Sequence, residues 1–134
     1  MALAAAQANN MTAQIAVKEC SMGIVSAQHW TKSFMVIKNG MFRVYLSEHS
    51  ATATPDDFLF ETPLDTDFKA SPWKRKEYSE VSNSKKDFYC FYLQKKGMLG
   101  MTKILKIGLE DIDLVERIMR CIEANTHNPT TKLK

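Results

Sequence analysis

Cysteine, histidine, proline and glycine are all scarce in this chain of 134 residues, and each shortage limits what it can be. The three cysteines are an odd number and lie far apart, so no disulfide framework is expected and a reducing compartment is favoured. The three histidines have no neighbouring Cys or His at ligand spacing, so neither a metal site nor a cofactor is predicted. With 45% hydrophobic and 25% charged residues, the remaining composition is that of an ordinary globular domain.

Long apolar runs are also missing. The longest fall far short of the roughly 20 residues that a membrane-spanning helix needs, so any membrane contact must be peripheral. Residues 1–14 are rich in Ala, Gln and Asn and carry no charge, unlike a secretory signal or a transit peptide. Ala2 stands where myristoylation requires Gly. We therefore expect a cytoplasmic protein in which residues 1–14 form a flexible leader.

Sequence patterns typical of catalysis are absent. The glycine motifs of nucleotide-binding sites and of hydrolase nucleophiles do not occur, so the chain is not predicted to be an enzyme. The acids Asp56, Asp57, Asp65 and Asp67 fall in predicted loops, and Asp65-Thr66-Asp67 lacks the glycine and the distal glutamate of a calcium loop. Nucleic-acid binding is disfavoured as well, because the aromatic residues of 88–92 alternate between two faces and about half of them must be core.

An Asn-Gly pair gives the clearest structural signal. Asn39-Gly40 separates two β-rich runs, residues 30–37 and 41–46. This pair favours a tight type I′ hairpin, because both central residues of that turn need a positive φ. Apolar and polar residues alternate along the second run, which is typical of a strand in a sheet with one buried face.

The second half of the chain predicts a hairpin followed by a helix. Residues 88–93 and 102–109 are β-rich runs on either side of a polar turn. After Asp111, a candidate N-cap, apolar residues recur at three- and four-residue steps as far as Asn125, as in an amphipathic helix. Elsewhere the pattern predicts short strands at residues 58–60 and 77–81 and a long loop or irregular crossing at residues 65–76.

Together these elements predict a mainly β (α+β) fold: a seven-stranded antiparallel barrel capped by one C-terminal amphipathic helix. The folded domain is expected to span residues 15–125, and residues 126–134 form a polar tail.

Residues 30–45 resemble the pleckstrin-homology (PH) superfamily. Trp30-Thr31-Lys32-Ser33-Phe34-Met35-Val36-Ile37, the Asn39-Gly40 turn and Met41-Phe42-Arg43-Val44-Tyr45 are similar in type and spacing to the family's W-K-x-R-W-F-V-L strand, short turn and L-x-Y-Y strand. The similarity extends over roughly residues 15–125. The closing helix has Ile118 or a neighbour where the family usually has tryptophan. The resemblance implies a PH-like barrel that binds lipid, protein or both.

One departure from the family bears on lipid binding. Phosphoinositide-binding members share a K-x(n)-K/R-x-R pattern across the first hairpin. Lys18 matches the first lysine, but Thr31 and Ser33 occupy the K/R-x-R positions and leave only Lys32 between them. An arginine fork holds phosphate through two hydrogen bonds, whereas serine offers one neutral bond. A PH domain recruited by phosphoinositide or phosphatidic acid is therefore the alternative hypothesis.

Charge is distributed unevenly, which fits either weak association with anionic membranes or lysines that are simply solvated in loops. Residues 47–67 carry six acids and no base, whereas residues 68–109 carry ten bases and three acids. Each base close to an anionic bilayer contributes about 1 kcal/mol. Met98, Leu99 and Met101 lie in the same turn, where they either insert shallowly or pack against the barrel mouth. The candidate residues for lipid or anion binding are Lys18, Lys32, Arg43, Lys85, Lys86, Lys95, Lys96 and Lys103.

A protein-interaction module is the other hypothesis. A partly open barrel presents a strand edge and a groove beside its helix, where an extended peptide can add a strand. An exposed tryptophan can anchor a partner, although a loop tryptophan can also fold back on its own barrel. The candidate partner-binding residues are Trp73, Lys74, Arg75 and Lys76. We therefore predict a non-catalytic adaptor or targeting module that binds a protein partner and associates weakly with anionic phospholipid, peripheral to a membrane or to the cytoskeleton.

Overall fold

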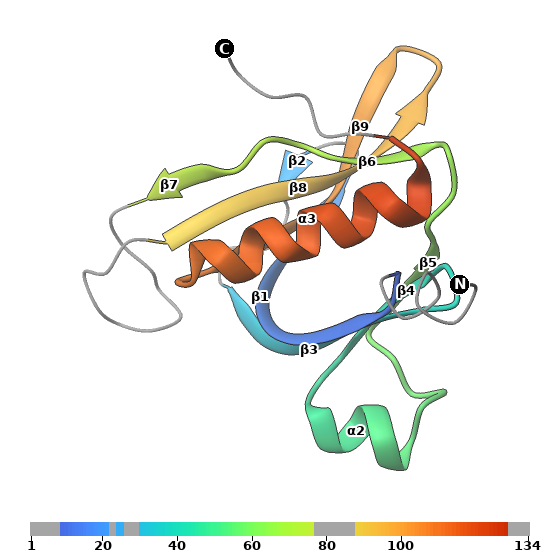
Figure 1. The fold of residues 1–134 in the computed structure, drawn as a ribbon, viewed down its shortest axis with the longest axis vertical. Coiled ribbons are helices and arrows are strands. Elements are labelled where there is room, and N and C mark those ends of the chain that lie inside the picture. The colour runs from blue at the N-terminus through green and yellow to red at the C-terminus, as the bar shows by residue number, and fades with distance from the viewer. Residues whose placement is uncertain (1–8, 22–23, 26–29, 77–87, 129–134) are drawn as a thin grey trace.

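The computed structural model describes residues 9–21, 24–25, 30–76 and 88–128 (Figure 1). Within these ranges the chain is mainly antiparallel β-sheet with one long C-terminal helix, which confirms the predicted fold class. In chain order the elements are β1 (Met11–Ser21), β2 (Ile24–Val25), β3 (Thr31–Lys38), β4 (Met41–Tyr45), α2 (Glu48–Ala53), β5 (Phe60–Pro63), β6 (Phe68–Ala70), β7 (Lys74–Lys76), β8 (Phe88–Gly97), β9 (Gly100–Leu109) and α3 (Ile112–Thr126).

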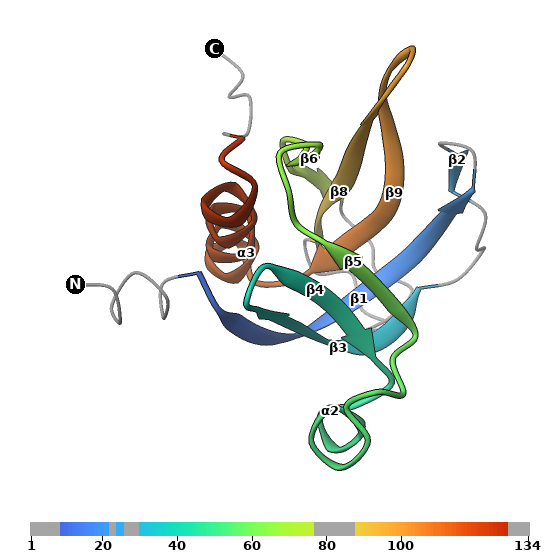
Figure 2. The ribbon, with the colours of Figure 1, turned by 90° about the vertical axis from the view of Figure 1, so that its right-hand side faces the viewer.

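Seven strands form the main path of the sheet, in the order β5-β4-β3-β1-β9-β8-β6. Two further short strands lie beside this path, β2 against β1 and β7 against β8. β1 joins the two halves, because it pairs with β3 over residues 11–17 and with β9 over residues 16–19. The sheet bends strongly along β1 (Figure 2). β5 and β6 end the path without pairing with each other in the described part of the chain, so the sheet is open there.

The Asn39-Gly40 turn between β3 and β4 is confirmed. Asn39 has φ 54° and Gly40 has φ 76°, as a type I′ hairpin requires. The expected irregular crossing at residues 65–76 is wrong in part, because this segment contains β6 and β7. Both are three-residue edge strands separated by a proline, too short to give a periodic pattern. The strand expected at residues 77–81 lies outside the described residues.

The core lies between the inner face of the sheet and α3, which crosses that face (Figure 1). Alternate residues of β1, β3, β4, β8 and β9 point inward, and α3 contributes a fully buried stripe that includes Ile118. The Asp111 side chain accepts hydrogen bonds from the backbone N–H groups of Asp113 and Leu114, so the predicted N-cap is confirmed. The helix ends at Thr126, one residue later than expected, and His127 follows in the left-handed conformation.

Both ends of the folded unit reach further than the sequence indicated. β1 begins at Met11, four residues before the expected boundary at residue 15. The preceding Asn9 carbonyl accepts hydrogen bonds from Asn125 Nδ2 (2.8 Å) and from the Cys121 thiol (3.4 Å), which hold this end against α3. At the other end, Asn128 Nδ2 donates to the carbonyl oxygens of Thr66 and Phe68, next to β6. Side chains of α3 therefore hold the first described residues, and Asn128, just beyond α3, holds the last ones.

A short helix covers part of the outer face of the sheet. The break in strand pattern after β4 is α2, which begins at the N-cap Ser47. Phe34 and Tyr45 pair across β3 and β4 and are buried although they face outward. The Tyr45 hydroxyl donates a 2.7 Å hydrogen bond to the Pro55 carbonyl, just beyond α2. The rest of the outer face, over β1, β9 and β8, carries lysine and aromatic side chains.

Candidate functional site

Two lysines and a tyrosine form a row across the outer face of three neighbouring strands. Val17 and Ile107 are core residues, so the residues next to them in β1 and β9 point outward. The strand register pairs Lys18 directly with Lys106, and Lys106 in turn with Tyr92 of β8. Side chains at such paired positions are immediate neighbours.

Aromatic rings hold the ammonium groups of this row. Lys18 Nζ and Lys106 Nζ lie 5.1 Å and 5.4 Å from the centroid of the Trp30 ring. Lys106 Nζ is also 5.7 Å from the centroid of Tyr92, and Lys103 Nζ is 4.4 Å from that centroid. A cation over an aromatic face is stabilised by about 0.5–1 kcal/mol when partly exposed. Lys106 therefore lies between two rings, each shared with a second lysine.

Small residues beneath the rings make this arrangement possible. Trp30 packs edge-on against Phe88, with ring centroids 5.0 Å apart and an interplanar angle of 74°. Together with Cys90 they cover Ala16 of β1, which pairs with Gly108 of β9. A Cβ atom at Gly108 would overlap the Phe88 ring and come within 3.0 Å of the Trp30 ring. Glycine at this position lets the rings lie directly on the strand backbone.

The basic face, as we name it, comprises Lys18, Lys69, Lys103 and Lys106 with the rings of Trp30 and Tyr92. These four are half-buried, whereas the other lysines with described side chains are exposed. Lys69 joins the group through the register, because it pairs with Gln94, which pairs with Lys103. No acid occurs in β6, β8 or β9, and the one acid of β1, Glu19, alternates to the inner face. Four half-buried cations thus share one face on which these strands place no acid.

The hairpin of β8 and β9 projects beyond the rest of the sheet (Figures 1 and 2). Its last register pair is Gly97 with Gly100, and Met98 and Leu99 between them are fully exposed. We call Met98 and Leu99 the hairpin tip. Met101 beside it is 42% exposed, so these apolar residues lie in solvent and do not pack against the barrel mouth. Adjacent exposed apolar side chains of this kind are a common feature of surfaces that bind a protein or a membrane.

The structure separates the predicted lipid-binding residues into several places. Lys18 and Lys103 belong to the basic face, and Lys96 is exposed beside the hairpin tip. Lys95 Nζ lies 5.6 Å from the ring centroid of the core residue Phe68, on the opposite face from Lys103. Lys32 is exposed and pairs with Ala16 on the outer face. Arg43 does not join the basic face, because it forms an ion pair with Glu61 and stacks over Phe58. Lys85 and Lys86 lie outside the described residues.

The predicted partner-binding residues do not form one patch. Trp73 is half-buried against the core, and its ring meets Tyr89 edge-on at 5.4 Å and 88°. Lys74 and Arg75 are exposed, but as successive residues of β7 they point to opposite faces. Lys76 is the last residue of β7. Trp73 thus anchors this segment on its own domain.

Four residues of the basic face were not predicted as site residues: Lys69, Lys106, Trp30 and Tyr92. Lys106 alternates with Leu105 and Ile107, which signals an outward position but no particular neighbour. Its proximity to Lys18 depends on the pairing of β1 with β9, which are about 90 residues apart in sequence. The residues of the basic face are therefore brought together by the pairing register of the strands, not by proximity in the sequence.

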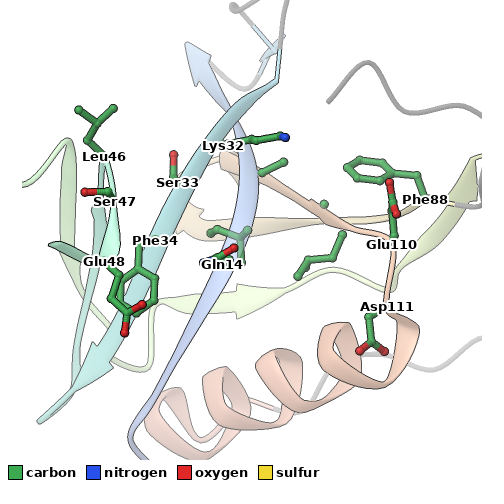
Figure 3. A pocket seen from close by; sticks show the side chains of 14 residues that line it. Gln14, Lys32, Ser33, Phe34, Leu46, Ser47, Glu48, Phe88, Glu110 and Asp111 are labelled. Carbon is green, nitrogen blue, oxygen red and sulfur yellow. The ribbon is translucent and has the colours of Figure 1, made fainter. Parts of the chain in front are cut away.

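A groove of about 570 Å³ crosses the outer face of β1 next to the basic face (Figure 3). Gln14 lies at its centre, between Leu46 on the β4 side and Phe88 on the β8 side. Lys32, Glu48, Glu110 and Asp111 give the walls charges of both signs. A smaller hollow of about 250 Å³ lies on the inner face, lined by Val17, Glu19, Thr31, Val44, Leu59, Phe60 and Leu105.

Comparison with known proteins gives no family assignment, since no protein-family model and no curated protein sequence matches the chain. Among the described residues, no group of three His, Cys, Asp or Glu side chains is placed to hold a metal ion. Within the same residues, no helix has the length and apolar character needed to cross a bilayer.

Proposed function

We propose that the protein is a non-catalytic targeting module that binds anionic membranes through the hairpin tip and the lysines behind it. The observation that carries the proposal is the full exposure of Met98 and Leu99 at the end of a projecting hairpin. Full burial of such a side chain away from water is worth roughly 1.5–3 kcal/mol. A bilayer offers that burial without a complementary protein pocket.

The distances of two lysines from the hairpin tip fit binding to an anionic bilayer. A strand rises about 3.3 Å per residue, so Lys96 follows Met98 at about 7 Å and Lys103 follows Leu99 at about 13 Å. When the tip enters the apolar zone, these ammonium groups reach the level of the anionic headgroups. Each contributes about 1 kcal/mol there, which gives reversible and salt-sensitive binding.

The PH-like resemblance is part of this proposal. The antiparallel sheet and the closing helix support it, as does the Asn39-Gly40 hairpin. The usual phosphoinositide pocket of the first hairpin is not favoured. Ser33, at the position of its arginine, is buried, and its hydroxyl donates a 3.3 Å hydrogen bond to the Thr31 carbonyl. Membrane affinity is therefore assigned to the hairpin tip.

Vesicle co-sedimentation tests the proposal. Wild-type protein is mixed with neutral or phosphatidylserine-containing vesicles at low and at physiological salt, in parallel with the variant Met98→Ser/Leu99→Ser. The variant is expected to bind about a hundredfold more weakly or worse, because it loses the apolar contribution of both side chains. Leu46→Ser is the matched control, since Leu46 is 64% exposed but lies at the end of β4 next to α2. Equal sedimentation of wild type and the tip variant would refute the proposal.

Binding of a protein partner is the second candidate, and the groove beside β1 favours it. Leu46 offers an apolar contact, while Glu48, Glu110 and Asp111 provide acids for a basic residue of an extended peptide. Selection from a displayed peptide library tests this function. Enriched peptides are expected to be apolar and basic and to lose binding to Leu46→Asp. Enriched peptides that still bind Leu46→Asp would exclude the groove as the peptide-binding site.

A further inference from the structure

We infer that the groove beside β1 binds the hairpin tip of a second copy of this chain, so that the protein associates head to tail. The inference names an occupant for the groove and rests on the second candidate function, the binding of a protein segment there. It does not depend on membrane binding, although it gives the hairpin tip a second use.

The groove combines an apolar floor with acidic walls. Phe34 and Phe88 are buried residues that line it, and Leu46 at its rim is 64% exposed. Glu48, the first residue of α2, stands on one wall and Glu110 stands opposite (Figure 3). Both carboxylates are exposed, and neither has an ion-pair partner in the described part of the chain. A segment that fits this groove therefore needs apolar side chains next to a positive charge.

The net charge of the groove is negative. Three acids and one base line it: Glu48, Glu110 and Asp111 against Lys32. Asp111 already caps α3, since its side chain accepts two backbone hydrogen bonds. Glu48 and Glu110 are thus the acids that are left to attract a cation.

The β8–β9 hairpin carries side chains of the matching kind. Met98 and Leu99 are fully exposed at its end, and Met101 beside them is 42% exposed. Lys96 is exposed two residues before Met98, which is about 7 Å along the strand, and has no ion-pair partner among the described residues. The hairpin therefore offers two leading apolar side chains followed by a cation, which complements the floor and the walls of the groove.

The groove also has room for such a tip. Its volume of about 570 Å³ lies within the range of roughly 300–1,000 Å³ that is usual for pockets that enclose a drug-sized ligand. Gly97 and Gly100 on either side of the tip have no side chains, so the end of the hairpin is narrow. Because the hairpin projects beyond the sheet, its end can reach a groove on another molecule (Figure 2).

The contact must join two molecules. Gly100, next to the tip, and Gly108, which lines the groove, are eight residues apart on β9, which is about 26 Å along a strand. The hairpin and α2, which borders the groove, lie at opposite ends of the molecule (Figure 2). A hairpin tip therefore cannot enter the groove of its own chain.

The two contact surfaces differ, so the association is heterologous and can continue from copy to copy as a short chain or a ring. Interfaces below about 1,200 Å² are typical of weak, transient complexes, and a tip of two residues belongs to this class. We expect a dissociation constant between about 10 μM and 1 mM, raised by salt because Lys96 faces acids. A tip held in a groove is not available to a bilayer, so self-association and membrane insertion exclude each other at that hairpin.

Analytical ultracentrifugation without vesicles tests the inference. The average mass of the wild type is expected to rise with concentration and to exceed that of a dimer. Met98→Ser/Leu99→Ser has a groove but no apolar tip, and Leu46→Asp has a tip but a charged groove rim, so each variant alone should stay monomeric. Leu59→Ser is the matched control and should associate as wild type does, since Leu59 is 52% exposed but lines the hollow on the inner face.

Mixing the two variants makes the test specific. An equimolar mixture is expected to form dimers and nothing larger, because the tip of Leu46→Asp enters the groove of Met98→Ser/Leu99→Ser and the chain then ends. NMR shifts should be confined to residues 96–101 when the former is labelled, and to residues 14–16, 46–48 and 108–111 when the latter is labelled. Lys96→Glu should lose self-association and regain it when it is mixed with Glu110→Lys.

Three results would overturn the inference: a wild type that stays monomeric at about 1 mM, a mixture of the two variants that stays monomeric, or full self-association of Leu46→Asp, which would indicate contact between two tips. Leu46→Asp is expected to bind vesicles normally, so failure of membrane binding and failure of self-association are separate results. Enrichment of library peptides by a wild type that does not self-associate would refute this inference and leave the second candidate function intact.

Discussion

Lys18 and Lys106 face each other across β1 and β9, and both ammonium groups lie over the ring of Trp30. Side chains at paired positions of adjacent strands are immediate neighbours, so the two lysines share one ring. Contact with the ring stabilises both ammonium groups, and Gly108 beneath the rings of Trp30 and Phe88 allows their close approach.

Gly108→Ala is expected to destabilise the protein by about 1–3 kcal/mol, because its Cβ would overlap the Phe88 ring. Displacement of the rings should also change the fluorescence of Trp30. Gly97→Ala is the control, since its Cβ would meet the Gly100 carbonyl oxygen at 3.4 Å, an ordinary contact. Urea denaturation followed by fluorescence gives both readouts, and similar losses in the two variants would argue against tight packing at Gly108.

Asn125→Ala is expected to reduce the free energy of unfolding by about 1 kcal/mol, because the Asn9 carbonyl loses its 2.8 Å partner on α3. Arg120→Ala, an exposed change on the same helix, should alter stability by less than about 0.5 kcal/mol. Hydrogen exchange should show faster exchange at the start of β1 in the Asn125 variant alone. Unchanged protection there would mean that this hydrogen bond does not hold the strand.

The free energy of unfolding should depend on pH at alkaline pH partly through the thiol of Cys121. Burial raises the pKa of its thiol to about 11, above the value of about 8.5 in an unfolded chain. Its contribution to stability is therefore complete below the unfolded pKa and is lost as the pH rises toward 11. The free energy of unfolding should fall more steeply between pH 9 and 11 in wild type than in Cys121→Ser, as measured by urea denaturation. Parallel slopes would contradict the assignment.

Features set by local sequence could be predicted, and features set by long-range pairing could not. The Asn39-Gly40 hairpin and the Asp111 cap depend on neighbouring residues, and both are confirmed. β6 and β7 were not predicted, because the conformation of such short edge strands depends on their pairing with β8 and not on their own sequence.

In the candidate site, too, local features could be predicted and long-range contacts could not. Met98 and Leu99 were recognised as apolar residues in a polar turn, whereas the contact of Lys106 with Trp30 required the register of three strands. Single-sequence patterns indicate which way a strand residue faces but not which residue lies beside it.

Insertion of the hairpin tip is tested most directly by a tryptophan placed in it. The variant Leu99→Trp is mixed with phosphatidylserine-containing vesicles that carry brominated acyl chains, and its fluorescence is compared with that of wild type and of Leu46→Trp. Insertion of the tip predicts a blue shift and strong quenching for Leu99→Trp and no added quenching for the other two proteins. Bound protein whose tryptophan at residue 99 is neither shifted nor quenched would contradict insertion of the tip.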